Sequence, residues 1–79
     1  MIVTVVGIGK LVKGNYQGYD YMLRPLYVSY KDPSKVEDGL CTERFKVPDH
    51  VSDLKGIVVG SEIDVSFNRW GKIIDVKGV

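Results

Sequence analysis

Hydrophobic and polar residues alternate along most of this chain with the two-residue period of a β-strand. The clearest case is the segment 62–68, where Ile63, Val65 and Phe67 alternate with polar side chains. This pattern is typical of a strand that has one face in the core and the other in water. The C-terminal third of the chain therefore predicts a half-buried strand.

The residues after this strand predict a hairpin. The sequence "NRWG", residues 68–71, has the composition of a tight turn, and residues 72–79 are again rich in β-branched side chains. We expect a closing strand in which Ile74 and Val76 face inward.

The first 31 residues predict two long strands. Residues 2–12 form a β-branched run that is interrupted by Gly7 and Gly9, and glycines inside a strand usually mark a bend, a bulge or a close backbone approach. Residues 13–18, "KGNYQG", are typical of a hairpin loop. Residues 19–31 then form the second strand, which is long enough to curl around a barrel.

The faces of this second strand can be assigned only as far as its proline. Tyr19, Tyr21 and Leu23 alternate and so share one face. Pro25 cannot donate a ladder hydrogen bond, and we expect it at a sheet edge or a bulge. A bulge would exchange the two faces, so the orientation of Tyr27 stays open at this point.

The middle of the chain predicts a third strand and a short helical turn. In residues 40–47, "LCTERFKV", the side that holds Cys41, Phe45 and Val47 is the expected core face. Residues 48–56, "PDHVSDLKG", begin with proline and end with glycine, which leaves room for a single turn of helix.

These elements predict an all-β fold in one domain that spans residues 1–79. A second core could not bury enough surface in a chain of 79 residues. Five antiparallel strands, with a helical turn between the third and the fourth, predict an OB-like barrel. An SH3-like barrel is the alternative, since its strand count is similar.

Composition and charge exclude several classes of function. Apolar residues make up 44% of the chain and no apolar run is long enough to cross a bilayer, so we expect a cytoplasmic protein with no membrane partner. A single cysteine and a single histidine, His50, supply too few ligands for a structural metal site and no nucleophile with its base. We therefore expect no cofactor and no enzymatic activity.

The net charge is only +1, but it is unevenly distributed. Residues 1–31 hold four basic side chains against one acidic one, a net charge of +3. Residues 32–54 hold three basic against six acidic side chains, a net charge of −3, and residues 55–79 carry +1. Such asymmetry can produce one basic face on a nearly neutral protein.

Aromatic and basic residues concentrate on the second strand and in the two hairpin turns. Single-stranded nucleic acids are bound by rings that stack on bases and by cations that contact phosphates. The candidate rings are Tyr16, Tyr19, Tyr21, Tyr27, Tyr30 and Trp70, and the candidate cations are Lys10, Lys13, Arg24, Arg69 and Lys72.

Structural roles compete with binding roles for these rings. The face of Tyr19 and Tyr21 can be part of the core with its hydroxyl groups at the rim, and Trp70 can fold back over the barrel end. Tyr27 and Tyr30 lie on opposite faces, so at most one of them belongs to the core.

The C-terminal stretch "VGSEIDVSFNRWGKIIDVKG" and the tyrosine-rich strand after "KGNYQGYDY" resemble the small OB-fold single-stranded-DNA-binding proteins of phages and plasmids. The resemblance implies DNA rather than RNA as the ligand. It implies stacking roles for Tyr16, Tyr19, Tyr21 and Trp70, and backbone contacts for Lys13, Arg24 and Arg69.

The sequence thus predicts non-catalytic binding of single-stranded nucleic acid with weak sequence preference. The alternative is a structural or protein-interaction module, including a homodimer, because tyrosine, tryptophan and arginine are also enriched at protein interfaces.

Overall fold

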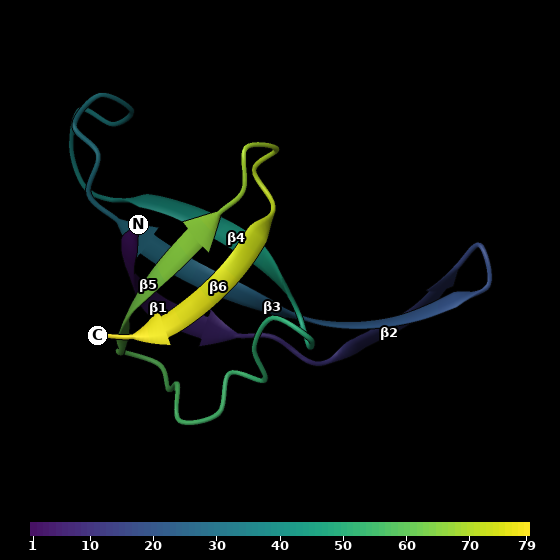
Figure 1. Cartoon of the computed structure of the whole chain (residues 1–79). Coiled ribbons are helices and arrows are strands. Elements are labelled where there is room, and N and C mark those ends of the chain that lie inside the picture. Colours follow the sequence, from purple (N-terminus) through teal and green to yellow (C-terminus); the bar gives the residue numbers. More distant parts are fainter.

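Six antiparallel β-strands make up the regular structure of the chain, and there is no helix. The computed structural model describes all residues, 1–79. The strands are β1 (Ile2–Ile8), β2 (Val12–Tyr16), β3 (Tyr19–Tyr30), β4 (Cys41–Pro48), β5 (Glu62–Phe67) and β6 (Ile73–Gly78) (Figure 1). The all-β prediction is confirmed.

The strands form one sheet with the order β2-β3-β1-β5-β6, and β4 pairs with the other edge of β3. The first half of β3 pairs with β2, and its second half lies between β1 and β4. The β2–β3 hairpin therefore extends beyond the rest of the sheet as an arm (Figure 1). β4 and β6 are not paired, so the sheet is not closed, and the prediction of a closed five-stranded barrel is wrong.

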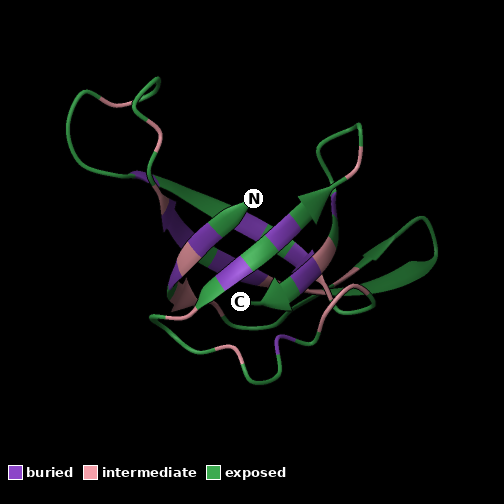
Figure 2. Cartoon of the chain, turned by 60° about the vertical axis from the view of Figure 1, so that its left-hand side comes forward, coloured by how far each residue is buried: buried purple, intermediate pink, exposed green.

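The core lies between the two halves of this curved sheet. Its fully buried side chains come from β1, β3, β4 and β5: Val3, Val5, Leu26, Val28, Val47, Ile63 and Val65 (Figure 2). The predicted core face of β4 is confirmed, since Phe45 and Cys41 are also buried.

The predicted first strand, residues 2–12, divides into β1 and β2. Its register with β3 shifts between Val5 and Gly7, which is a bulge at the place where glycine predicted one. Residues 9–11 lie outside the strands and connect β1 to β2, which pairs again with β3. The predicted loop 13–18 is also shorter than expected: only Gln17 and Gly18 lie outside the strands.

Pro25 lies where β3 changes its partner from β2 to β1, and not at an edge or a bulge. The Pro25 carbonyl accepts a hydrogen bond from the Gly9 amide, at 2.8 Å, and the register with β4 runs without interruption from Leu23 to Tyr30. Pro25 has no N–H to donate back to Gly9, so this pair holds a single hydrogen bond, and the alternation of faces continues through Pro25 to Tyr27.

The segment between β4 and β5 contains no helix, so the predicted helical turn is also corrected. The Pro48 carbonyl accepts hydrogen bonds from two following amides, but the turn ends there. The side chains of Ser52 and Asp53 accept from the amides of Leu54 and Lys55, which competes with helical bonding. Leu54 has a φ of 57°, which a helix does not allow.

Ile74 points outward, contrary to the prediction. The register between β5 and β6 passes from Ser66–Asp75 to Phe67–Ile73, so Ile74 is an extra residue in β6. The bulge turns Ile73 inward and leaves 55% of Ile74 exposed. Val76 faces inward as predicted.

Candidate nucleic-acid interface

Four tyrosines lie in a row on the outer face of β2 and β3, and we call this row the tyrosine stripe. Tyr19, Tyr21 and Tyr27 share one face because each is an even number of residues from the next in an unbroken strand. Tyr16 joins them because it is the direct partner of Tyr19 across the hairpin. The eight steps from Tyr19 to Tyr27 span about 26 Å at roughly 3.3 Å per residue.

The rings of the stripe are exposed. The exposed fraction is 69% for Tyr16, 79% for Tyr19, 45% for Tyr21 and 42% for Tyr27. The core role that the sequence left open for Tyr19 and Tyr21 is therefore excluded.

Two of these rings pack against glycines on the neighbouring strands. A Cβ atom at Gly14 would collide with the Tyr21 ring, and one at Gly7 would lie 3.4 Å from the Tyr27 ring. The two rings thus lie against bare backbone, an arrangement by which aromatic residues cover glycine in a sheet. The contact with the backbone holds both rings in defined positions, while the other face of each ring stays in solvent.

A two-residue turn sets the tip of the arm. Gln17 and Gly18 have φ values of 51° and 82°, and positive values at both positions are the signature of a type I′ turn. This turn matches the twist of the strands and brings Tyr16 opposite Tyr19. Tyr16 is accordingly a strand residue, although the sequence placed it in a loop.

Two cations lie beside the stripe that the sequence did not select. Arg44 is the direct β4 partner of Tyr27, and Lys46 is the partner of Pro25. Both cationic side chains are exposed and share the outer face. The alternation with Phe45 predicts that they point outward, but only the register shows that they lie beside tyrosines.

Two of the predicted cations lie elsewhere. Lys13 pairs with Met22 on the face of the arm opposite to the rings, next to the hydrogen bond of 2.8 Å between Asn15 and Asp20. Arg24 pairs with Val47 and is half-buried on the core-facing side of β3.

Trp70 and Arg69 form a second exposed feature at the β5–β6 turn. The Asn68 side chain accepts hydrogen bonds from the amides of Trp70 and Lys72, both at 2.9 Å, which shapes the turn. The Arg69 guanidinium lies 4.3 Å from the centre of the Trp70 ring, and 71% of Trp70 is exposed. Trp70 therefore does not fold back over the sheet, and its turn projects separately from the arm (Figures 1 and 2).

The remaining candidate ring, Tyr30, packs against the core and is half-buried, on the face opposite to Tyr27 as expected. Its hydroxyl group accepts a hydrogen bond of 3.2 Å from Lys35, and this bond raises the pKa of Lys35. Lys10 is exposed in the short connection between β1 and β2.

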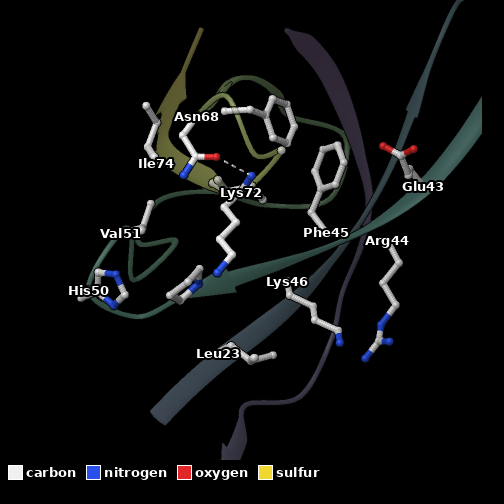
Figure 3. Close-up of a pocket in the computed structure, with 14 residues that line it drawn as sticks. Leu23, Glu43, Arg44, Phe45, Lys46, His50, Val51, Asn68, Lys72 and Ile74 are labelled. Atoms are coloured by element: carbon white, nitrogen blue, oxygen red, sulfur yellow. Dashed lines mark hydrogen bonds between the residues drawn. The ribbon is translucent and has the colours of Figure 1, made fainter.

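An open groove runs between β4 and β6. Its floor holds Phe45 and Phe67, whose rings meet edge to face with 5.5 Å between centres. In Figure 3 Lys72 and Asn68 lie on the same side of β4 as Phe45, whereas Lys46 and Arg44 point to the other side. Leu23 at the base of the arm also borders the groove, which therefore reaches the part of the stripe between Tyr21 and Tyr27.

The residues of the chain form no group of three or more His, Cys, Asp or Glu side chains that could hold a metal ion. No helix could cross a membrane. Comparisons with protein-family models, with curated proteins and with solved structures found no match to this chain.

Proposed function

We propose that this protein binds single-stranded nucleic acid along the tyrosine stripe without catalysing a reaction. One observation carries the proposal: four exposed rings lie along one face, with Arg44 and Lys46 beside the Tyr27 end of the row. Bases stack on such rings with a gain of about 1–3 kcal/mol each, and the cations contact phosphates.

Trp70 supplies a further contact in this proposal. Arg69 covers one side of its ring, which leaves the other side for a base. Lys13 extends from the back of the arm and Arg24 is half-buried, so their contribution is electrostatic and smaller. The preference for DNA over RNA rests on the resemblance to small phage and plasmid proteins alone.

We also propose that the sheet is an open relative of the OB barrel. The order of pairing supports this view, because β1 and β2 together act as one bent first strand and pair with both β3 and β5. The single pairing that would close such a barrel is between β4 and β6. In OB proteins, ligands bind on the face of the second and third strands, which correspond to β3 and β4 here.

A titration of fluorescein-labelled dT12 followed by anisotropy tests this function. Twelve nucleotides are enough to cover the stripe, since stacked single strands rise about 3.4 Å per nucleotide. We expect saturable binding in the micromolar range at low salt. With two phosphate contacts, the logarithm of affinity should fall with the logarithm of salt concentration with a slope of about −1.4. An absence of saturation at low salt would refute the proposal.

A second candidate is a homodimer that forms through the stripe. The protruding arm supports it, because three tyrosines on one face of the arm are exposed to solvent and could pack against a second copy. Sedimentation velocity separates the two functions. A dimer that persists unchanged when dT12 is added favours the homodimer, and a monomer whose sedimentation changes with dT12 favours nucleic-acid binding.

A further inference from the structure

The groove between β4 and β6 has an unpaired strand on each side. β4 and β6 run in the same direction, because each is separated from β1 by one antiparallel neighbour. The groove has a volume of 1160 Å³, above the roughly 300–1,000 Å³ that is typical of small-molecule sites. Its size and its strand edges suit an extended chain.

The free backbone groups of β4 can be assigned from its register. The Asp49 amide donates to the Met22 carbonyl of β3 at 3.0 Å, and hydrogen-bonded pairs alternate along an antiparallel ladder. Alternate residues, Thr42, Arg44 and Lys46, therefore direct their N–H and C=O groups away from β3 and toward the groove.

The same residues oppose pairing with a second copy of the chain. Every symmetric antiparallel register that joins most of β4 to its copy sets like charges opposite each other: Glu43 against Glu43, Arg44 against Arg44, Arg44 against Lys46, or Lys46 against Lys46. Like charges in directly opposite positions destabilise a strand pair, and lysine on an edge strand is a common protection against self-association.

We propose that an acidic extended peptide binds in this groove as an added strand on the free edge of β4. Residues directly opposite one another in a strand pair share a face, so acidic side chains of the peptide would lie beside Arg44 and Lys46. The residue between them would lie on the other face, against Phe45 and the apolar floor of the groove. The site thus selects alternating acidic and apolar residues.

Backbone chemistry favours a peptide over a nucleic acid at this edge. Arg44 and Lys46 each offer one N–H donor and one C=O acceptor, and a peptide strand returns both kinds of hydrogen bond. The sugar-phosphate chain of DNA offers acceptors to the N–H groups but no regularly spaced backbone donor for the carbonyls. The peptide would thus bind the backbone edge of β4, whereas nucleic acid would bind the rings of the tyrosine stripe. The charges of Arg44 and Lys46 are shared by the two sites.

A pair of methylated peptides tests the proposal on the unmodified protein. The probe is a fluorescein-labelled octapeptide that alternates Asp and Val. In the proposed register the Asp residues form the hydrogen-bonded pairs with Arg44 and Lys46. We expect N-methylation of the Asp residues to weaken binding at least tenfold, whereas N-methylation of the Val residues should change affinity less than threefold.

Hydrogen exchange locates the peptide. We expect the amides of Arg44 and Lys46 to become protected when the unmethylated peptide is added. Equal affinity for the two methylated peptides, or no protection at 1 mM peptide, would overturn the proposal, as would protection of these amides by dT12 but not by the peptide.

Charge reversal gives an independent check. In the variant that combines Arg44→Glu with Lys46→Glu, we expect preference to move from the Asp-Val peptide to a Lys-Val peptide. The variant that combines Lys55→Glu with Lys77→Glu makes the same change in net charge at exposed positions outside the groove; it is the matched control and should keep the original preference. An unchanged preference in the reversed variant, with a native circular dichroism spectrum, counts against the site.

Discussion

At the scale of single residues, three glycines show how backbone without side chains shapes this surface. Gly7 and Gly14 make room for tyrosine rings of the stripe, and Gly9 makes room for Pro25. The cost of adding a Cβ differs between them, because the far end of an exposed ring can move while a buried proline ring cannot.

Gly9→Ala should therefore destabilise the protein. Its Cβ would lie 2.9 to 3.2 Å from three atoms of the buried Pro25 ring, and overpacking of this kind costs about 1–3 kcal/mol. Gly78→Ala is the matched control, because nothing lies within 4 Å of its Cβ, and it should change stability by less than about 0.5 kcal/mol. Urea denaturation followed by circular dichroism measures both; equal stabilities would contradict the close approach.

Asp32 provides a residue-scale test by pH. The Ser34 side chain and amide donate hydrogen bonds of 2.6 and 3.1 Å to its carboxylate, which lowers the pKa of Asp32 below its ordinary value of 3.8. A lowered pKa means that this contribution to stability is present above the unfolded-state pKa and is lost as pH falls through the folded-state pKa.

We expect Ser34→Ala to raise the pKa of Asp32 toward 3.8, as measured by carbon-detected NMR titration of the carboxyl group. Ser66→Ala, on β5 and away from Asp32, should leave that pKa unchanged. If Ser34→Ala has no effect, the side-chain hydrogen bond is not the main cause of the shift.

At the scale of elements, alternation predicted the strands well and their ends poorly. The core faces of β4 and β5 follow directly from their two-residue period. The prediction that Ile74 faces inward was wrong, because one bulged residue exchanges the faces of a strand. The helical turn failed for a local reason: Ser52 and Asp53 bind nearby amides, and Leu54 adopts a positive φ.

The rings of the candidate site could be predicted from the sequence, but the cations beside them could not. Aromatic composition selected Tyr16, Tyr19 and Tyr21, which all lie on one face of the arm. Arg44 and Lys46, which lie opposite Tyr27 and Pro25, come from a separate strand, and only the pairing of β3 with β4 brings them to the stripe. A single sequence holds no direct signal for that register.

The arm should be separable from the rest of the sheet. None of its residues from Val12 to Leu23 is buried. Hydrogen-bonded pairs alternate with non-hydrogen-bonded pairs along the ladder, and Val12–Leu23 is a pair of the same kind as Tyr16–Tyr19, which flanks the turn. An Asn-Gly turn can therefore replace residues 13–22.

We expect both this shortened protein and the full chain to unfold cooperatively, and the shortened protein to bind dT12 at least tenfold more weakly. The reason is the loss of three of the four stripe rings, each contributing about 1–3 kcal/mol of stacking. Thermal circular dichroism and anisotropy measure the two properties. Unchanged affinity in a folded shortened protein would place the binding site elsewhere.

At the scale of the whole molecule, the open sheet leaves β4 as an edge that its own charges protect. Replacing both cations, Arg44→Thr with Lys46→Thr, removes the like-charge contacts that oppose pairing between copies. We expect self-association to increase at least tenfold in sedimentation equilibrium. A control with Lys55→Thr and Lys77→Thr removes the same charge from positions outside β4 and should self-associate no more strongly than the original chain.

The proposed function requires that the face of the arm with the tyrosines, and not its opposite face, binds single-stranded nucleic acid. Tyr21 and Met22 are adjacent in β3, are exposed to similar extents of 45% and 37%, and point to opposite faces. Comparing Tyr21→Ala with Met22→Ala therefore shows which face of β3 binds, because both changes are made at the same place along the strand.

The most direct measurement is the affinity of these two variants for dT12 at low salt, relative to the original chain. Loss of one stacking ring predicts that Tyr21→Ala binds about five- to 150-fold more weakly, while Met22→Ala binds within twofold of the original. Equal losses in the two variants, or no loss in Tyr21→Ala, would contradict the tyrosine stripe as the binding surface.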